Sequence, residues 1–181
     1  MEQIDFNRAL ILAEEIHLGQ VRTGTNKPYI THPMAVAQLL IEYGRPKNEV
    51  IAGLLHDTVE DTTGDKLALR KRIEDKFGLE VERLVFYVTK ISCREDGNRS
   101  TRVKIDIYHY VSGPEGSHNI KLADVMHNLS DADTLDPQFA KKYVKEKHML
   151  LLALEAVNKA DKQMLIDTRI LIDKLLLRFN K

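Results

Sequence analysis

Apolar residues recur at intervals of three and four positions along almost the whole of this 181-residue chain. That interval matches the 3.6 residues of a helical turn, so it predicts helices that each bury one face. Glycine and proline fall mainly between these segments, for example at Gly44, Pro46 and Gly78, where helices end. We therefore expect an all-α protein, a single-domain bundle of about eight to ten helices over residues 1–181.

The expected helices cover about residues 5–19, 33–44, 48–62, 65–77, 79–91, 101–111 and 117–129, followed by two between 138 and 181. Asp5 is expected to cap the first helix and Asp161 the last. The last helix has a wide apolar face. We interpret this face as core packing, with the surface of a homo-oligomer as the alternative.

Charge and cysteine content narrow the classes of function. Lys plus Arg and Asp plus Glu number 27 each, so the formal net charge is zero. This balance argues against a nucleic-acid binder, which needs a net basic surface, but not against a small anionic ligand. The only cysteine is Cys93, the N-terminus lacks signal-peptide features, and no apolar run approaches the roughly 20 residues of a membrane span. We expect a cytoplasmic protein without membrane attachment.

The segment 48–62 carries the most informative cluster of polar residues. It is apolar through residues 50–55 and then presents His56, Asp57, Glu60 and Asp61. On one continuous helix, His56 and Glu60 would be neighbours, as would Asp57 and Asp61, and the two aspartates would repel each other. A divalent cation would remove this repulsion. On spacing alone, solvated acids at a frayed helix end are the favoured interpretation.

Two further segments strengthen the case for a metal. His32 begins a helix beside Pro33, which fixes its backbone conformation. Asp124 lies among apolar neighbours in the middle of a helix, with Asn128 on the same face. Nothing local shows that these helices meet.

Four motifs occur in an order that resembles a known family. They are Gly19-Gln20-Val21-Arg22, Pro28-Tyr29-Ile30-Thr31-His32-Pro33, His56-Asp57-Thr58-Val59-Glu60-Asp61-Thr62, and Lys121-Leu122-Ala123-Asp124 with His127-Asn128. Over roughly residues 5–135 the chain resembles the HD-type hydrolase domain of RelA/SpoT alarmone enzymes, especially the stand-alone small alarmone hydrolases. A synthetase domain is not expected to follow.

The resemblance implies site residues and a cofactor. The implied metal ligands are His32, His56, Asp57 and Asp124, and the metal is usually Mn²⁺, although this donor set also suits Fe or Zn. Glu60 and Asp61 match the catalytic pair, while Arg22 and Asn128 match residues that contact the nucleotide. Lys27 and Lys121 are further candidates for neutralising a pyrophosphate, although we favour solvated positions for both. Asp131 replaces a common threonine of the family and adds negative charge near the substrate.

The remaining histidines are expected to matter less. His17, His109 and His148 are interpreted as surface or satisfied helix residues, and His118 as lying outside the pocket. His127 follows Asp124 by three residues, so we expect it to support the site rather than bind the metal.

The implied reaction is loss of the 3′-pyrophosphate from ppGpp or pppGpp by attack of a metal-activated water. Beside Asp131, the chain departs from the family by one extra residue between Arg22 and His32, and by the segment 112–119. These departures leave open a second substrate class, another phosphorylated nucleotide such as NADPH. A non-catalytic nucleotide sensor is the third hypothesis, and the presence of all four ligands and both catalytic acids argues against it.

Overall fold

The structure is a computed structural model that describes residues 3–179, and this part of the chain forms ten α-helices and two short 3₁₀ helices. The α-helices are α1 (Gln3–Ile16), α2 (Thr31–Glu42), α3 (Lys47–Leu55), α4 (Thr58–Asp61), α5 (Lys66–Phe77), α6 (Leu79–Val88), α7 (Arg99–Val111), α8 (Glu115–Ser130), α9 (Pro137–Val157) and α10 (Lys162–Phe179). The 3₁₀ helices are η1 (Arg94–Asp96) and η2 (Ala132–Thr134). The expected all-α class is confirmed. The expected domain covered residues 1–181, and its last helix was expected to reach residue 181. Residues 1–2 and 180–181 lie outside the described residues.

The ends of the helices test the predicted caps. Asp161 is confirmed as the cap of α10, because its Oδ1 accepts from the backbone N–H groups of Gln163 and Met164 at 2.9 and 3.0 Å. The prediction for Asp5 was wrong: α1 already begins at Gln3, so Asp5 lies in its first turn. There a carboxylate still interacts favourably with the helix dipole.

The single helix expected over 48–62 is in fact two helices with a corner at His56-Asp57. The Thr58 hydroxyl donates to the carbonyl of Leu55 at 2.7 Å. This side-chain hydrogen bond takes the place of the backbone N–H that would bond to that carbonyl in a continuous helix. Asp57 has φ −95° and ψ −8°, a conformation typical of turns. His56 and Asp57 therefore project from a corner and not from the side of a continuous helix.

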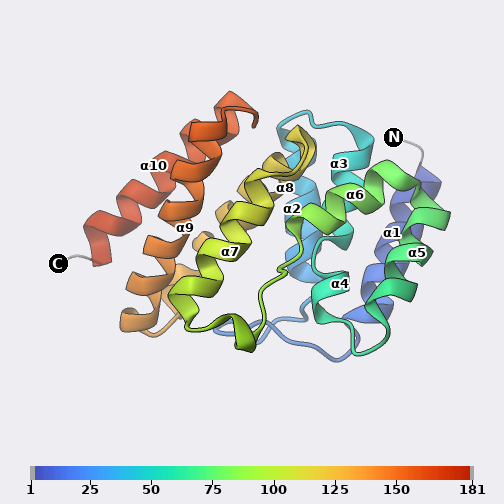
Figure 1. Cartoon of the computed structure of the whole chain (residues 1–181), viewed down its shortest axis with the longest axis horizontal. Coiled ribbons are helices and arrows are strands. Elements are labelled where there is room, and N and C mark those ends of the chain that lie inside the picture. The colour runs from blue at the N-terminus through green and yellow to red at the C-terminus, as the bar shows by residue number, and fades with distance from the viewer. Residues whose placement is uncertain (1–2, 180–181) are drawn as a thin grey trace.

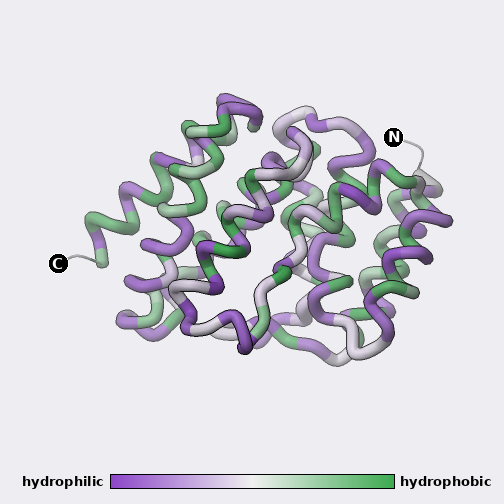
Figure 2. The backbone as a smooth tube through the Cα atoms, viewed as in Figure 1, coloured by the Kyte–Doolittle hydropathy of each residue, from purple (hydrophilic) through white to green (hydrophobic). Residues whose placement is uncertain are grey.

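The helices form a bundle in which α2, α3 and α8 lie between two flanking groups (Figure 1). α9 and α10 pack together at one end, and α1 and α5 lie at the other. α2 packs against both α3 and α8, so the starts and ends of these three helices are held near one another. Along α9 and α10 hydrophobic and hydrophilic residues alternate with the helical period (Figure 2), as expected for helices with one buried face.

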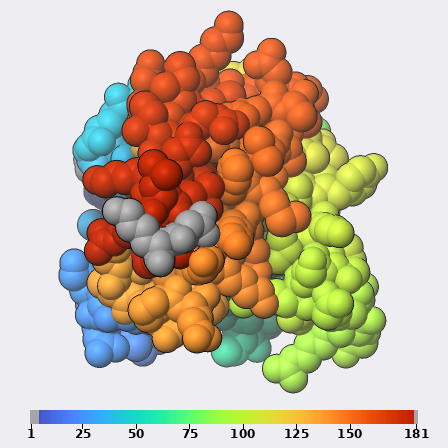
Figure 3. Space-filling view, turned by 90° about the vertical axis from the view of Figure 1, so that its left-hand side faces the viewer, coloured from blue at the N-terminus to red at the C-terminus, as the bar shows by residue number. Residues whose placement is uncertain are grey.

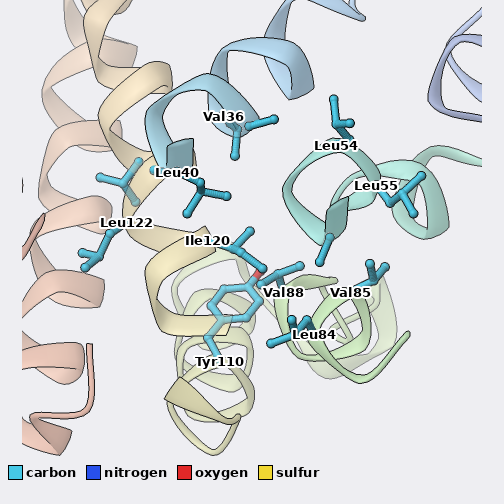
Figure 4. Packing of buried hydrophobic residues seen from close by; sticks show 14 of the residues in the cluster. Val36, Leu40, Leu54, Leu55, Leu84, Val85, Val88, Tyr110, Ile120 and Leu122 are labelled. Atoms are coloured by element: carbon cyan, nitrogen blue, oxygen red, sulfur yellow. The ribbon is translucent and has the colours of Figure 1, made fainter. Parts of the chain in front are cut away.

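The core lies between α2, α3, α6, α7 and α8. Figure 4 shows Leu84, Val88, Tyr110 and Ile120 pointing toward one another, and Ile120 is fully buried. Burial of each large apolar side chain contributes about 1.5–3 kcal/mol. At Gly53, a Cβ atom would lie 2.6 Å from Cδ1 of Leu40, so only glycine allows α3 to approach α2 this closely. That approach brings His56, at the end of α3, toward His32, at the start of α2.

The segment 112–119 consists of a short turn at 112–114 and the first residues of α8, and it packs tightly on other helices. A Cβ on Gly113 would lie 2.8 Å from Cβ of Tyr87, and one on Gly116 would lie 2.9 Å from Cγ of Glu49. The segment therefore packs on α6 and α3, and its residues do not line the cavity described below.

The C-terminal helices cover one face of the molecule (Figure 3). Met164, Ile172 and Leu175 of α10 are buried, which confirms a core-packing role for this helix. Ile166, Ile170 and Leu177 remain exposed on its outer side. Among the described helices, none combines the length and the apolar character that crossing a bilayer would need.

Candidate metal centre

Side chains from three separate parts of the chain converge at one point. Nε2 of His32 lies 3.1 Å from Nε2 of His56, and Oδ1 of Asp124 lies 3.3 Å from the first and 3.8 Å from the second. Their potential ligand atoms all lie within 4.8 Å of one another. Oδ2 of Asp57 lies 3.1 Å from Nε2 of His56 and 3.4 Å from Nε2 of His32. The structure therefore brings together the four residues that the family resemblance implied as ligands.

The partners of the two imidazoles leave lone pairs at this point. Nδ1 of His56 lies 2.8 Å from the carbonyl of Gly53, which can only accept, so this nitrogen carries the proton. Nδ1 of His32 lies 2.8 Å from Nδ1 of His127, which can fix His32 in the same tautomer. Both Nε2 atoms then offer lone pairs beside two carboxylates. Such a set of donors fits a divalent cation, so the observed geometry meets the requirement for metal binding.

The two carboxylates are held in the ionised state that ligation requires. Burial opposes ionisation of Asp57, but the protonated form of His56 lowers the pKa of Asp57 well below the usual range. A divalent cation would take the place of the proton on Nε2 of His56. Burial likewise opposes ionisation of Asp124, whose pKa is lowered by Lys121 and by Lys147. The centre therefore carries negative charge within an otherwise buried region.

Tyr29 is a site residue that the sequence analysis quoted within a motif but assigned no role. Its hydroxyl donates to Oδ2 of Asp57 at 2.7 Å. Burial and the neighbouring Asp57 raise the pKa of Tyr29, so it remains a neutral donor. His127, the expected supporting residue, does contact His32. Tyr29 and His127 thus orient one carboxylate and one imidazole.

Glu60 and Asp61 point in different directions, contrary to the convergence expected from one helix. Glu60 lines the cavity beside the centre and forms an ion pair with Lys90. Asp61 lies on the side of α1, with Oδ2 3.8 Å from Nδ1 of His17. Burial, followed by Asp57 and Glu60, raises the pKa of Asp61. His17 is not a surface helix residue: it lies after the end of α1, is only 3% exposed and contacts Gln20 at 2.9 Å.

A cavity of about 470 Å³ opens from the metal centre. Asp57 and Asp124 lie at one end, and α7 and α9 form the opposite wall. Five cationic side chains line it: Lys90, Arg99, Arg102, Lys121 and Lys147. Five carboxylates line it as well: Asp57, Glu60, Asp106, Asp124 and Glu146. With a divalent cation at the centre the lining would carry net positive charge, which suits an anionic ligand with several phosphate oxygens. Of the five cations, the sequence analysis identified only Lys121 as a candidate contact.

The predicted substrate residues have different environments. Lys121 is only 6% exposed and donates to Oδ2 of Asp124 at 2.8 Å, so the preference for a solvated position was wrong. Lys27 is exposed in the loop before α2. Arg22 is 8% exposed and donates at 3.2 Å both to Asn128 and to Asp131. The extra negative charge of Asp131 is thus directed at Arg22.

A second cavity of about 230 Å³ adjoins the first, because Tyr29, Asn128 and Tyr143 line both. Arg22 and Asp131 lie on one side of it, and Phe139 and Tyr143 stack on the other with ring centroids 5.7 Å apart. The aromatic rings offer a flat surface on which a planar group can stack. His118 lines neither cavity and lies buried within α8, as expected.

Comparison with known proteins identifies the framework that holds this centre. A family model described as the HD domain matches residues 9–108. The chain belongs to the HD domain family. The matched residues include three of the four converging side chains, His32, His56 and Asp57. An HD domain implies a divalent metal, and here the donor set of His32, His56 and Asp124, with Asp57 beside them, fits one.

Relatives of this HD domain occur within much longer proteins. It is 36% identical over 138 residues to a guanosine-3′,5′-bis(diphosphate) 3′-pyrophosphohydrolase of Spiroplasma citri, covering 74% of this chain and 18% of that protein. It is 38% identical over 141 residues to a GTP pyrophosphokinase of Streptomyces coelicolor, covering 77% of this chain and 16% of that protein. The chain therefore spans less than a fifth of the length of these curated relatives.

The fold has a solved counterpart of similar size. The structure of a metazoan ortholog of SpoT that hydrolyses ppGpp superposes with a TM-score of 0.79 and 22% sequence identity. The match covers 98% of this chain and 97% of the other. All ten helices thus belong to an arrangement known from a solved structure, including α9 and α10, which lie beyond the residues matched by the HD family model.

Proposed function

We propose that this HD domain is a metal-dependent phosphohydrolase that removes the 3′-pyrophosphate from guanosine alarmones, ppGpp and pppGpp. One observation carries the proposal: four side chains suited to binding a metal converge, and two of them, Asp57 and Asp124, line a cavity together with five cations. The names of the relatives and of the solved counterpart support the same substrate class. We propose Mn²⁺ as the metal, and His32, His56, Asp57 and Asp124 as its ligands.

When bound there, a divalent cation supplies an activated water and a positive charge for a phosphoryl oxygen. Glu60 lines the cavity and is placed to accept the proton of the attacking water. We propose Asp61, directly after it in α4, as the second acid of the pair; it lies toward His17 and does not itself line the cavity. Burial and the charges of Asp57 and Glu60 raise the pKa of Asp61. In the completed reaction the proton taken from the water ends on the 3′ oxygen that leaves, so that bonds and charges balance.

The adjoining cavities divide the substrate between them. Lys121 lies beside Asp124 and neutralises charge on the pyrophosphate. Asn128 lines both cavities and Arg22 lines the smaller one, where they contact the sugar or its phosphates. The stacked Phe139 and Tyr143 offer a surface for the base. Asp131 limits the charge that Arg22 presents, and Lys27 contacts substrate only at the outer edge of the loop. We propose action in the cytoplasm.

The decisive experiment measures pyrophosphate release from ppGpp by the purified protein, first after EDTA treatment and then after addition of Mn²⁺. We expect no release without metal and restored release with it. NADPH assayed in parallel provides the competing substrate. Phosphate release from NADPH without pyrophosphate release from ppGpp would replace the alarmone proposal with the other nucleotide class.

Absence of turnover with every substrate, despite bound metal, would favour a nucleotide sensor.

We also propose that the protein forms a homo-oligomer, which light scattering of the same preparation tests. Exposed Ile166, Ile170 and Leu177 on α10 provide an apolar surface for a homo-oligomer.

A further inference from the structure

Lys147 lies in α9, outside all the motifs that resemble the RelA/SpoT family, yet it lines the cavity together with Asp57 and Asp124. Its side chain is half-buried. A lysine in such a position must either have an anionic partner or carry a cost for the loss of solvent around its ammonium group.

Most cations of the cavity already have carboxylate partners. Lys90 pairs with Glu60, Lys121 with Asp124 at 2.8 Å, and Arg99 with Glu146 at 2.7 Å. Arg102 forms no ion pair among the described residues; its charge adds a minor contribution to the lowered pKa of Asp96, after the hydrogen bonds from Cys93.

Lys147 differs from the three paired cations. Among residues 5–179 no carboxylate lies within ion-pair distance of its Nζ, which instead lies 5.0 Å from the centre of the Tyr143 ring. It is therefore the cavity cation whose nearest defined contact is an aromatic ring.

The groups around Lys147 show what its ammonium faces. Burial lowers the pKa of Lys147 to about 8, Asp124 and Asp57 favour its charged form, and Lys121 and Lys90 oppose it. Lys147 in turn helps to lower the pKa of Asp124. Lys147 thus lines the same cavity as Asp57 and Asp124, and among the described residues its ammonium group forms no ion pair with either carboxylate.

We propose that Lys147 binds the diphosphate group of the substrate at the metal centre, as a substrate-binding residue supplied by α9. This inference rests on the proposed function. The balance of charge supports it: the five cations that line the cavity are matched by five carboxylates (Asp57, Glu60, Asp106, Asp124 and Glu146), so a bound divalent cation leaves two positive charges. A terminal diphosphate group neutralises these charges and a neutral ligand does not.

The test compares Lys147→Met with Lys145→Met, which removes an exposed lysine of the same helix. Binding of inorganic pyrophosphate is measured by calorimetry on full-length protein loaded with one equivalent of Mn²⁺, and metal content is checked before and after. We expect Lys147→Met to bind pyrophosphate about tenfold more weakly or worse, as for loss of a charge-assisted hydrogen bond. Lys145→Met should match the wild type, and Lys147→Arg should retain most of the affinity.

Thermal unfolding without ligand separates binding from structure. Because the ammonium of Lys147 lacks a carboxylate partner, Lys147→Met should unfold at the same temperature as the wild type or higher. A lower unfolding temperature combined with weaker binding would assign Lys147 a structural role and overturn the inference. Unchanged pyrophosphate binding by Lys147→Met would also overturn it.

These outcomes are independent of the proposed function. If pyrophosphate binding depends on Lys147 but the wild type releases no pyrophosphate from ppGpp, the inference stands and the alarmone proposal falls. If ppGpp is hydrolysed and Lys147→Met binds pyrophosphate normally, the alarmone proposal stands and the inference falls.

Discussion

The two ends of the main cavity are built in different ways. At the metal end, three of the four converging residues are fixed by hydrogen bonds to neutral partners: Gly53 holds His56, His127 holds His32, and Tyr29 holds Asp57. Asp124 differs, because it accepts from the charged Lys121. At the opposite end, the wall of α7 and α9 holds its cations by ion pairs or leaves them with none, as for Lys147.

This difference indicates which part of the site has a fixed side-chain geometry before a ligand binds. Neutral hydrogen bonds orient the metal-binding atoms without competing for the cation. A cation on the cavity wall can leave its carboxylate partner and bind a phosphate oxygen instead. The free-energy cost of this exchange depends on how exposed the ion pair is. The metal end therefore fixes the chemistry, and the cationic wall decides which anion is held against it.

The largest effect is expected at the metal end. His56→Ala should lose both bound metal and activity, by more than about a thousandfold in turnover, because one imidazole donor and its fixed geometry are removed. Metal content by mass spectrometry and pyrophosphate release are the two measurements. His148→Ala, a partly buried histidine of α9 outside both cavities, serves as the control. A fully metallated His56→Ala protein would exclude His56 as a ligand.

Asp61→Asn should retain the metal and lose about a hundredfold or more in turnover, the usual size of a general acid–base contribution. The substitution keeps the shape of the side chain and removes its charge, so that folding and metal content should change little. Asp75→Asn, at an exposed position of α5, is the matched control. Wild-type turnover by the Asp61 variant would remove this residue from the reaction and leave Glu60 as the acid that accepts the proton.

Tyr29→Phe tests the orienting hydrogen bonds. Loss of the 2.7 Å bond to Asp57 should weaken metal binding about 10- to 100-fold, less than the loss of a ligand. Titration with a competing chelator measures this affinity. Unchanged affinity would mean that the helix corner at His56-Asp57 is sufficient to position the carboxylate.

The cationic wall should respond to pH. Lys147 has a lowered pKa of about 8, so it is charged below that pH and becomes neutral above it. The advantage of the wild type over Lys147→Met in pyrophosphate affinity, about tenfold at pH 7, should therefore shrink as the pH rises above 8. Calorimetry at a series of pH values measures this difference. An advantage that persists undiminished at pH 10 would contradict the assigned charge.

The same group gives a stability effect of opposite sign. Between pH 8 and the usual lysine pKa the unfolded chain binds more protons than the folded chain, so the contribution of Lys147 to stability rises with pH. Any gain in unfolding temperature from Lys147→Met should therefore be largest below pH 8 and fade above it.

The smallest effect is expected at Arg22. Asp131→Asn removes the charge that pairs with Arg22 at 3.2 Å, so the KM for ppGpp should fall about two- to fivefold, in keeping with a partly exposed ion pair. Asp133→Asn, on the exposed 3₁₀ helix nearby, is the control. A higher KM would show that Asp131 holds Arg22 in its productive position.

The sequence predicted the metal end better than the cationic wall, for a physical reason. His32, His56 and Asp124 each lie in local motifs that fix their backbone, and the resemblance to a family joined these motifs. Lys147 and Arg99 lie in ordinary helical stretches, where a lysine or arginine is usually solvated. Their approach to the cavity depends on how α7 and α9 pack on α8, which no local pattern contains.

The helical spacing of apolar residues predicted the fold, but it did not predict every local break in the helices. They located the helices and the cap at Asp161 because these depend on local hydrogen bonds. The corner at His56-Asp57 was missed because apolar residues continue with helical spacing on both sides of it. The hydroxyl of Thr58 was the available signal, since threonine can replace a backbone donor to a nearby carbonyl.

The position of α9 means that the cavity is lined by residues from two parts of the chain: the region matched by the HD family model and a helix beyond it. The HD family model ends at residue 108, whereas Tyr143 and Lys147 reach the cavity from a helix well beyond it. A change of register or composition in this one helix would leave the proposed ligands on α2, on α8 and at the corner after α3 in place. On the proposed role of Lys147, a designer seeking a new substrate should begin by varying the inward-facing positions of α9.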